Sequence, residues 1–211
     1  MRCILAGLGM FVIFTALRAI FESWNNDGFP EALAVKLELL PLLFPLHMVC
    51  GGLALLLVPA AFLLRGTPWH RVAGRAAAVD VMIAGMTAFP VALDAPVTRV
   101  SSAGFATQAL TWLVLLGLGI WNIRRHRVAQ HRAAMLMMAA VTSGALFFRV
   151  YLALWKLVGW HGGFLAFYAI DAWLAWTLPL LVTTVWLRRQ SSRLHQNSVA
   201  ADTRLGLVAQ R

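Results

Sequence analysis

The feature that most constrains this chain is a series of long apolar runs separated by short charged loops. The runs 42–64 and 133–155 each contain at most one charged residue, and each is as long as a helix that crosses the hydrocarbon core of a bilayer, about 20 residues. Because 61% of the residues are hydrophobic and only 12% are charged, a water-soluble domain would lack a polar surface. In lipid, runs of this length satisfy their backbone hydrogen bonds as helices. We therefore predict an all-α fold, a polytopic transmembrane helical bundle.

The predicted bundle forms one domain over residues 1–190. We expect about six helices, at residues 4–21, 42–64, 72–93, 103–123, 133–155 and 164–187. The first resembles a signal peptide, but Leu17 occupies a position where a cleavage site needs a small residue, so we predict an uncleaved anchor helix. Residues 31–40 are predicted to form a short amphipathic helix at the membrane interface. The polar tail, 191–211, is expected to be cytoplasmic and disordered.

The basic residues predict the orientation of the bundle. The formal net charge is +10, and the arginines gather in alternate loops, which is the pattern of the positive-inside rule. Placing these loops in the cytoplasm puts both termini there as well. This explanation of the charge disfavours nucleic-acid binding and favours contact with anionic lipid headgroups.

A faint internal repeat accompanies this topology. His70-Arg71 and His131-Arg132 each stand at the start of an outward-running helix, one after the second predicted helix and one after the fourth. The two motifs suggest a parallel repeat of helix pairs, formed by predicted helices two and three and predicted helices four and five.

The repeat predicts a polar cluster at the cytoplasmic face. Helix N-termini expose unpaired N–H groups, and nearby arginines make such ends suitable for an anion or for the acidic groups of a cofactor. Asp80 is predicted to pair with Arg75 or Arg132. The alternative is that these are ordinary topogenic charges. The cluster comprises His70, Arg71, Arg75, Asp80, His131 and Arg132.

A second cluster is predicted inside the membrane. His47, Arg149 and Asp171 stand at similar depths in predicted helices two, five and six, and Tyr168 lies one turn from Asp171. Ionisable groups in hydrocarbon usually face the bundle interior and have a partner. We therefore predict an Arg149–Asp171 ion pair with His47 beside it. Such a pair either belongs to a site for a substrate, proton or cofactor, or is structural and holds predicted helices five and six in register.

Several of these motifs resemble a known family. His47 with Gly51 and Gly52, then HRVAGR at 70–75, HRAAM at 131–135 and finally Arg149 resemble the bacterial domain of unknown function 2306 family of predicted membrane proteins. The resemblance covers residues 40–155 and implies a membrane helical bundle, without implying a substrate. We expect a multi-pass protein of the bacterial inner membrane. Ala134 stands where family members often have an aromatic residue. The wall of the predicted cytoplasmic cluster therefore departs from the family pattern at this position.

Three functions remain open at this stage, and no enzymatic reaction is assigned. The most concrete is b-type haem or quinone-linked electron transfer, because the bundle is loosely similar to cytochrome b561-like proteins. His70 with His131 would then hold one haem b, and His47 with His161 another. The second is a proton-linked or anion transporter that uses His47, Arg149 and Asp171. The third is a non-catalytic lipid-binding or assembly protein, with a membrane protein partner or a second copy of the chain.

Overall fold

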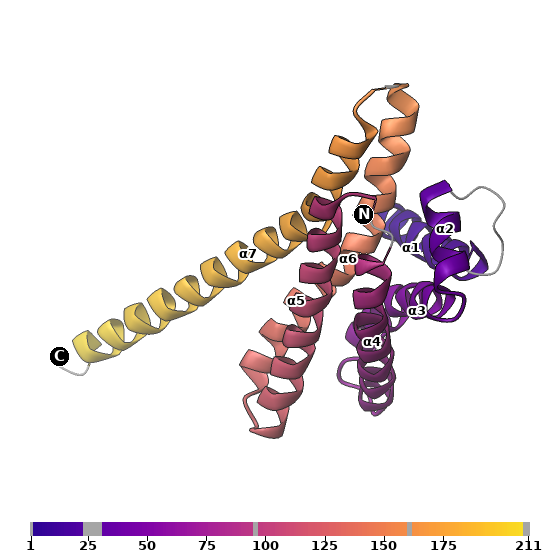
Figure 1. Cartoon of the computed structure of the whole chain (residues 1–211). Coiled ribbons are helices and arrows are strands. Elements are labelled where there is room, and N and C mark those ends of the chain that lie inside the picture. Colours follow the sequence, from indigo (N-terminus) through magenta and orange to yellow (C-terminus); the bar gives the residue numbers. More distant parts are fainter. Residues whose placement is uncertain (1, 23–30, 95–96, 160–161, 209–211) are drawn as a thin grey trace.

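The structure is a computed structural model that describes residues 2–22, 31–94, 97–159 and 162–208. Within these ranges every regular element is an α-helix (Figure 1). The helices are α1 (Arg2–Glu22), α2 (Glu31–Leu39), α3 (Leu43–Leu63), α4 (Trp69–Leu93), α5 (Arg99–Arg124), α6 (Val128–Val158) and α7 (Phe164–Val208). The all-α prediction is confirmed.

Five of the predicted membrane-spanning helices are long and apolar enough to cross a bilayer. These spans are Leu43–Leu63, Trp69–Leu93, Arg99–Arg124, Val128–Val158 and Phe164–Arg193. The remaining predicted span falls in α1, whose described apolar part is Gly9–Phe21, which is shorter than the about 20 residues that a perpendicular span requires. A short helix, α2, is present where the sequence predicts one at 31–40, but its apolar residues are not concentrated on one face.

All but one of the predicted membrane-spanning helices extend beyond a predicted end, whereas α3 is one residue shorter at each end than the predicted 42–64. Charged and aromatic residues such as Trp69, Arg99 and Lys156 lie inside α4, α5 and α6, because a helix does not have to stop where the hydrocarbon stops. The tail differs from expectation as well, since α7 continues as a helix to Val208 through the stretch expected to be disordered. Residues 190–208 contain no proline that would interrupt the backbone hydrogen bonds of a helix.

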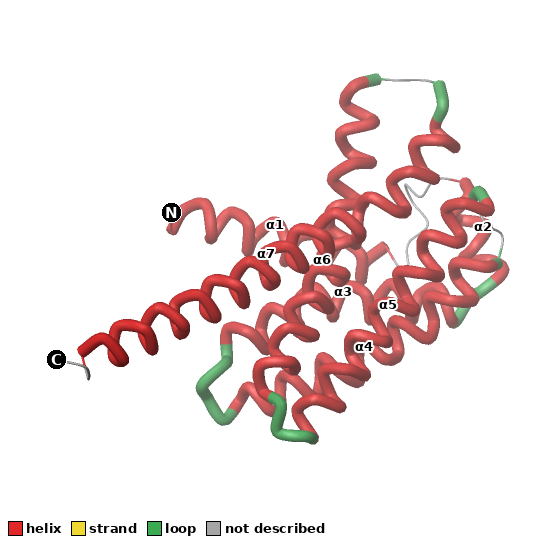
Figure 2. The backbone as a smooth tube through the Cα atoms, turned by 90° about the vertical axis from the view of Figure 1, so that its left-hand side faces the viewer, coloured by secondary structure: helices red, strands yellow, loops and turns green. Residues whose placement is uncertain are grey.

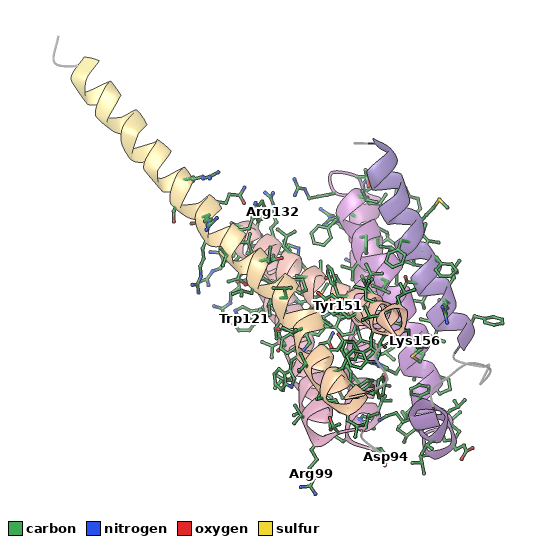
Figure 3. All side chains as sticks on the ribbon, turned by 90° about the horizontal axis from the view of Figure 1, so that it is seen from above. Asp94, Arg99, Trp121, Arg132, Tyr151 and Lys156 are labelled. Atoms are coloured by element: carbon green, nitrogen blue, oxygen red, sulfur yellow. The ribbon has the colours of Figure 1, made fainter. Side chains whose placement is uncertain are left out.

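The bundle is built from successive antiparallel hairpins. α3 packs along α4 and α5 along α6, while α7 packs on α6 and α5 and α1 lies against α3. The α3–α4 and α5–α6 loops lie at the same end of the molecule (Figures 1 and 2). We call this the basic end, because its loops and adjoining helix turns carry Arg65, Arg71, Arg75, Arg124, Arg125, Arg127 and Arg132. Figure 3 shows Asp94 and Arg99 on the same side of the molecule, away from Arg132.

Close helix crossings depend on small residues. A Cβ atom on Gly52 would stand 2.8 Å from the carbonyl oxygen of Ala16, so the backbones of α1 and α3 approach each other closely at this point. In the central core, Trp112 of α5 donates its indole N–H to Thr142 Oγ1 of α6 at 2.9 Å.

Many large apolar side chains, including Leu110 and Leu181, remain exposed on the outside, as expected for a surface that faces lipid.

Candidate functional site

His47 and Arg149 line one small cavity inside the bundle. The cavity has a volume of about 60 Å³ and lies between α1, α3 and α6. Gly51 and Gly52, which form one sequence motif with His47, also line its wall. Its lining comprises Ala19, His47, Met48, Gly51, Gly52, Leu55, Ala145 and Arg149. The structure therefore brings together two members of the predicted intramembrane cluster.

A hydrogen bond to the neighbouring helix orients the His47 ring. Its Nδ1 atom lies 3.0 Å from the carbonyl oxygen of Ala84 on α4. A carbonyl only accepts, so Nδ1 carries the proton and donates. The hydroxyl of Thr87, 3.5 Å from the same ring atom, donates to the carbonyls of its own helix at Ile83 and Ala84. In the neutral ring Nε2 is thus the unprotonated nitrogen, which accepts a proton or a hydrogen bond.

Arg149 is also held by its own helix. Its Nη1 donates to the carbonyl oxygen of Ala145, one turn earlier in α6, at 2.9 Å. The guanidinium is a permanent cation with several N–H groups in a planar fork, a geometry that matches a carboxylate. It is near enough to His47 for the two groups to interact electrostatically, and Lys36 of α2 also acts on His47. The cavity is therefore rich in donors and positive in character.

The predicted ion pair between Arg149 and Asp171 is wrong in this structure. Asp171 is 2% exposed, and among the described residues neither of its carboxylate oxygens has a hydrogen-bond partner. Tyr168 does lie near Asp171, as predicted from the one-turn spacing, and interacts with it electrostatically. The two halves of the predicted cluster separate because Arg149 lines a cavity between α1, α3 and α6, whereas Asp171 is buried in α7 and does not line that cavity.

The histidines at the basic end connect the two helices of each hairpin. His70 at the start of α4 donates from Nδ1 to the carbonyl oxygen of Ala61 on α3 at 2.8 Å. His131 near the start of α6 donates in the same way to Gly119 on α5 at 2.9 Å. Both hairpins therefore carry the same clamp, which gives the predicted repeat a structural role.

The other members of the predicted cytoplasmic cluster do not converge on one cavity. Arg71, Arg75 and Arg132 are exposed, and the predicted pairing of Asp80 with an arginine is wrong. Asp80 is buried in α4, where the group that interacts with it is the Cys50 thiol of α3. The reason for Arg75 is the helix geometry: it lies five residues before Asp80, about 140° away around the axis of α4, so the two side chains leave the helix on different faces.

Of the predicted haem ligands, His70 and His131 lie in different hairpins. The described residues contain no group of three or more histidine, cysteine or acidic side chains that would hold a metal ion. His70 and His131 bind to separate hairpins through their clamps. His161, the predicted partner of His47, lies outside the described residues.

Lys36 is a buried group that sequence reasoning did not place in a site. It is 6% exposed, and its Nζ atom donates to the carbonyl oxygens of Val91 and Asp94, the latter at 2.7 Å. α2 is thereby attached to the C-terminal end of α4. Burial lowers the pKa of Lys36, and the charge of Asp94 partly offsets this effect. The only signal in the sequence was a single lysine in the short segment predicted to be amphipathic.

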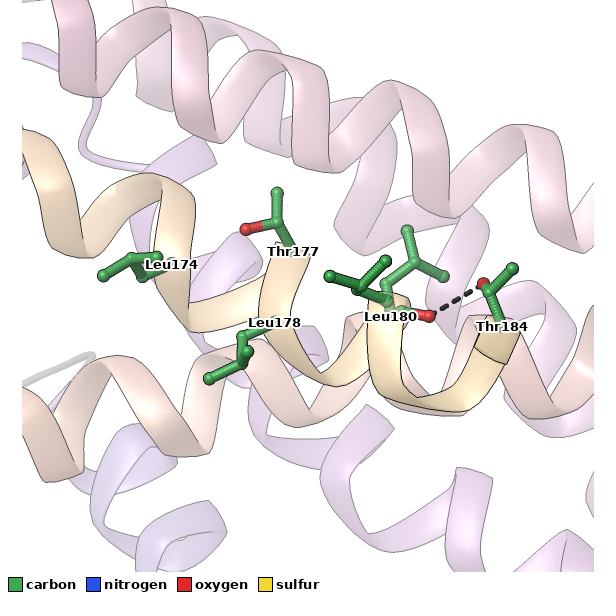
Figure 4. A pocket seen from close by; sticks show the side chains of 6 residues that line it. Leu174, Thr177, Leu178, Leu180 and Thr184 are labelled. Carbon is green, nitrogen blue, oxygen red and sulfur yellow. Dashed lines mark hydrogen bonds between the residues drawn. The ribbon is translucent and has the colours of Figure 1, made fainter. Parts of the chain in front are cut away.

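A larger groove of about 460 Å³ lies along α7. All its lining residues belong to that helix: Leu174, Thr177, Leu178, Leu180, Leu181 and Thr184 (Figure 4). The two threonine hydroxyls donate hydrogen bonds within α7. Thr177 donates to the carbonyl oxygen of Trp173, and Thr184 donates to that of Leu180. We regard this groove as part of the lipid-facing surface.

Comparison with known proteins gives one result. A family model described as predicted membrane protein (DUF2306) matches residues 44–187, a range that begins at the second residue of α3, contains α4 to α6 and ends within α7. Neither the curated proteins nor the solved structures gave a match.

Proposed function

We propose that this chain, which belongs to the DUF2306 family of predicted membrane proteins, is a carrier that binds the carboxyl group of a small organic acid between His47 and Arg149. The observation that supports it is the cavity that these two side chains line, inside helices that are long and apolar enough to span a membrane. Ionisable groups at such a depth most often mark a pathway for a substrate or an ion.

In this proposal His47 accepts the acidic proton of a carboxylic acid, and Arg149 binds the carboxylate. A neutral His47 already donates from Nδ1 to Ala84, so its Nε2 accepts the proton of the entering acid. The O–H bond of the acid breaks, an N–H bond forms at Nε2, and the carboxylate is left beside the imidazolium and the guanidinium of Arg149. Each such event takes up one anion together with one proton, so no net charge enters the hydrocarbon layer.

The size of the cavity selects the bound group. A volume of about 60 Å³ is well below the roughly 300–1,000 Å³ of pockets that enclose a drug-sized ligand. It accommodates a carboxylate or a carbonyl but not a haem or a quinone ring. The remainder of the acid would extend along the wall formed by Met48 and Leu55.

We also propose that the protein lies in the bacterial inner membrane with its basic end in the cytoplasm. The concentration of arginines at that end supports this orientation through the positive-inside rule. Both termini are then cytoplasmic if α1 crosses the membrane as well.

Binding and uptake of lactate, pyruvate and succinate test the proposal. We expect purified protein to bind at least one of these acids and to accumulate it in proteoliposomes when the outside is acidic. Arg149→Lys keeps the charge but loses the planar fork, and a lost charge-assisted hydrogen bond of about 1.5–3 kcal/mol weakens binding roughly 10- to 100-fold.

Arg99→Lys is the matched control, because Arg99 is exposed at the start of α5 and its replacement leaves binding unchanged. The proposal fails if wild-type vesicles take up none of the three acids faster than protein-free vesicles. It also fails if Arg149→Lys and Arg99→Lys bind the acids equally well.

Haem binding at the basic end is a second candidate. The Nδ1 atoms of His70 and His131 donate to backbone carbonyls, which is the arrangement that commonly orients a metal-ligating histidine and leaves Nε2 for the metal. A haem would have to lie between the two hairpins, where it would supply one-electron chemistry. An absorption spectrum of protein expressed with ample haem tests this, and a colourless preparation rules it out.

A further inference from the structure

Asp171 is the most deeply buried carboxylate in the described part of the chain. It lies in α7, with 2% of its surface exposed, and both its oxygens lack a hydrogen-bond partner among the described residues. It does not line the cavity of His47 and Arg149. Asp171 is therefore a separate polar position that the proposed acid site does not use.

The surroundings of Asp171 are apolar and tightly packed. Its neighbour Tyr168 packs edge to face against Phe148 of α6 at 5.4 Å and Phe105 of α5 at 6.0 Å between ring centroids. The residue that follows Asp171 is Ala172. Its carbonyl oxygen lies so close to α5 that a Cβ on Gly104 would stand 3.0 Å from it. Asp171 thus lies where α5, α6 and α7 meet, at a point with little free space.

The titratable groups around this position are few. Tyr168 on α7 interacts with Asp171 electrostatically. The helices packed on α7 carry Arg99 at the start of α5, and Arg149, Tyr151 and Lys156 in the second half of α6. Arg149 instead lines the acid cavity and donates to Ala145, and Asp171 has a hydrogen bond to none of these groups.

An ionised carboxylate in such a place would be strongly disfavoured, because burying a charge without a hydrogen bond or an ion pair is very unfavourable in a low-dielectric interior. A cation with its own coordination shell would need several oxygen ligands, whereas the rings of Phe105 and Phe148 offer none. A proton needs no additional space. We propose that Asp171 is a proton-binding site within the α5–α6–α7 interface, distinct from the His47–Arg149 cavity.

Occupancy of this site would be coupled to the packing of α7. The neutral acid fits the apolar interface, whereas its carboxylate form requires water or a cation and therefore favours a loosened interface. Pro179 lies two turns further along α7, where the missing N–H weakens the helix, and α7 is visibly bent along its length (Figures 1 and 2). Release of the proton would thus favour movement of α7 about this weak point.

Infrared difference spectroscopy of the purified full chain in lipid nanodiscs tests the site. The C=O stretch of a protonated carboxyl is separate from the bands of a carboxylate. At neutral pH we expect a protonated-carboxyl band that Asp171→Asn removes and that disappears reversibly when the pH is raised. Asp94→Asn is the control, because Asp94 is partly exposed outside the spans and its loss leaves this band unchanged.

A second variant separates Asp171 from the other buried carboxyl, Asp80. In the Asp80→Asn background the Asp171 band remains. If Asp171→Asn does not fold, aspartate carboxyl carbon NMR of ¹³C-labelled Asp80→Asn protein gives the same information. A spectrum without a protonated carboxyl at neutral pH overturns the proposal, as does a band that persists until the protein unfolds. Neither result depends on whether His47 and Arg149 bind an acid, so the two proposals fail independently.

Discussion

Gly51 offers the sharpest test of the cavity, because it is next to Gly52 in the sequence and yet has opposite surroundings. A Cβ atom on Gly51 meets no atom within 4 Å, whereas a Cβ on Gly52 would stand 2.8 Å from the Ala16 carbonyl oxygen. Gly51 also lines the cavity with His47 and Arg149. Gly51→Ala should therefore place one methyl group in the proposed binding site without disturbing a helix crossing.

The expected change in stability follows from two terms. Alanine favours an interior helix position over glycine by about 1 kcal/mol. At about 24 cal/mol per Å³ of cavity removed, complete filling of the 60 Å³ cavity would add at most ~1.4 kcal/mol, and one methyl group fills only part of it. We expect Gly51→Ala to raise the free energy of unfolding by about 1–2 kcal/mol.

Acid binding should change in the opposite direction. The methyl group occupies space that the carboxylate needs, and overpacking of about 1–3 kcal/mol corresponds to roughly 5- to 150-fold weaker binding. Thermal unfolding in detergent and calorimetric titration with the bound acid measure the two effects. Stabilisation combined with weaker binding is the expected signature, because few other single changes produce both.

Two glycine variants serve as controls. Gly117→Ala lies on the exposed face of α5 with no atom near its Cβ, so it gains the helix preference of about 1 kcal/mol and leaves binding unchanged. Gly52→Ala should destabilise the protein, because the Ala16 carbonyl belongs to the backbone and cannot rotate away. The reasoning is refuted if Gly51→Ala destabilises the protein as Gly52→Ala does, or if its affinity for the acid equals that of wild type.

Three further predictions concern stability and use thermal unfolding of the purified protein. His131→Ala removes the clamp to Gly119 and should lower the free energy of unfolding by about 1 kcal/mol. Thr142→Val leaves the buried indole N–H of Trp112 without its acceptor and should lower it by about 1–3 kcal/mol. Burial lowers the pKa of Lys36, so the unfolded chain binds more protons between that value and about 10.4, and stability should rise with pH through this window.

Each of these predictions has its own control. His126→Ala changes an exposed loop histidine and should leave stability unchanged; an equal loss in both histidine variants would contradict the clamp. Thr107→Val removes a hydroxyl that bonds only within its own helix and should have the smaller effect. Lys36→Met should abolish the contribution of this lysine to the rise with pH, and an identical pH profile in wild type and variant would show that Lys36 does not cause it.

The intramembrane cluster shows how far sequence reasoning reached. The sequence predicts that His47, Arg149 and Asp171 lie within the membrane at similar depths, by counting along each helix. Their grouping was not correct, since Arg149 joins His47 in one cavity while Asp171 is buried against another set of neighbours. The clamps of His70 and His131 were likewise located as motifs, but their carbonyl partners were not foreseen.

Long apolar helices with arginines at one end can be predicted from the amino-acid sequence alone, because in lipid each helical run satisfies its backbone hydrogen bonds internally. The family match over residues 44–187 agrees with that reading. The rotation of each helix about its axis, and hence which side chains meet, is seen first in the folded bundle. In water an apolar stripe reveals the buried face, but here the lipid-facing and core-facing sides are both apolar, so the periodicity of the sequence does not distinguish them.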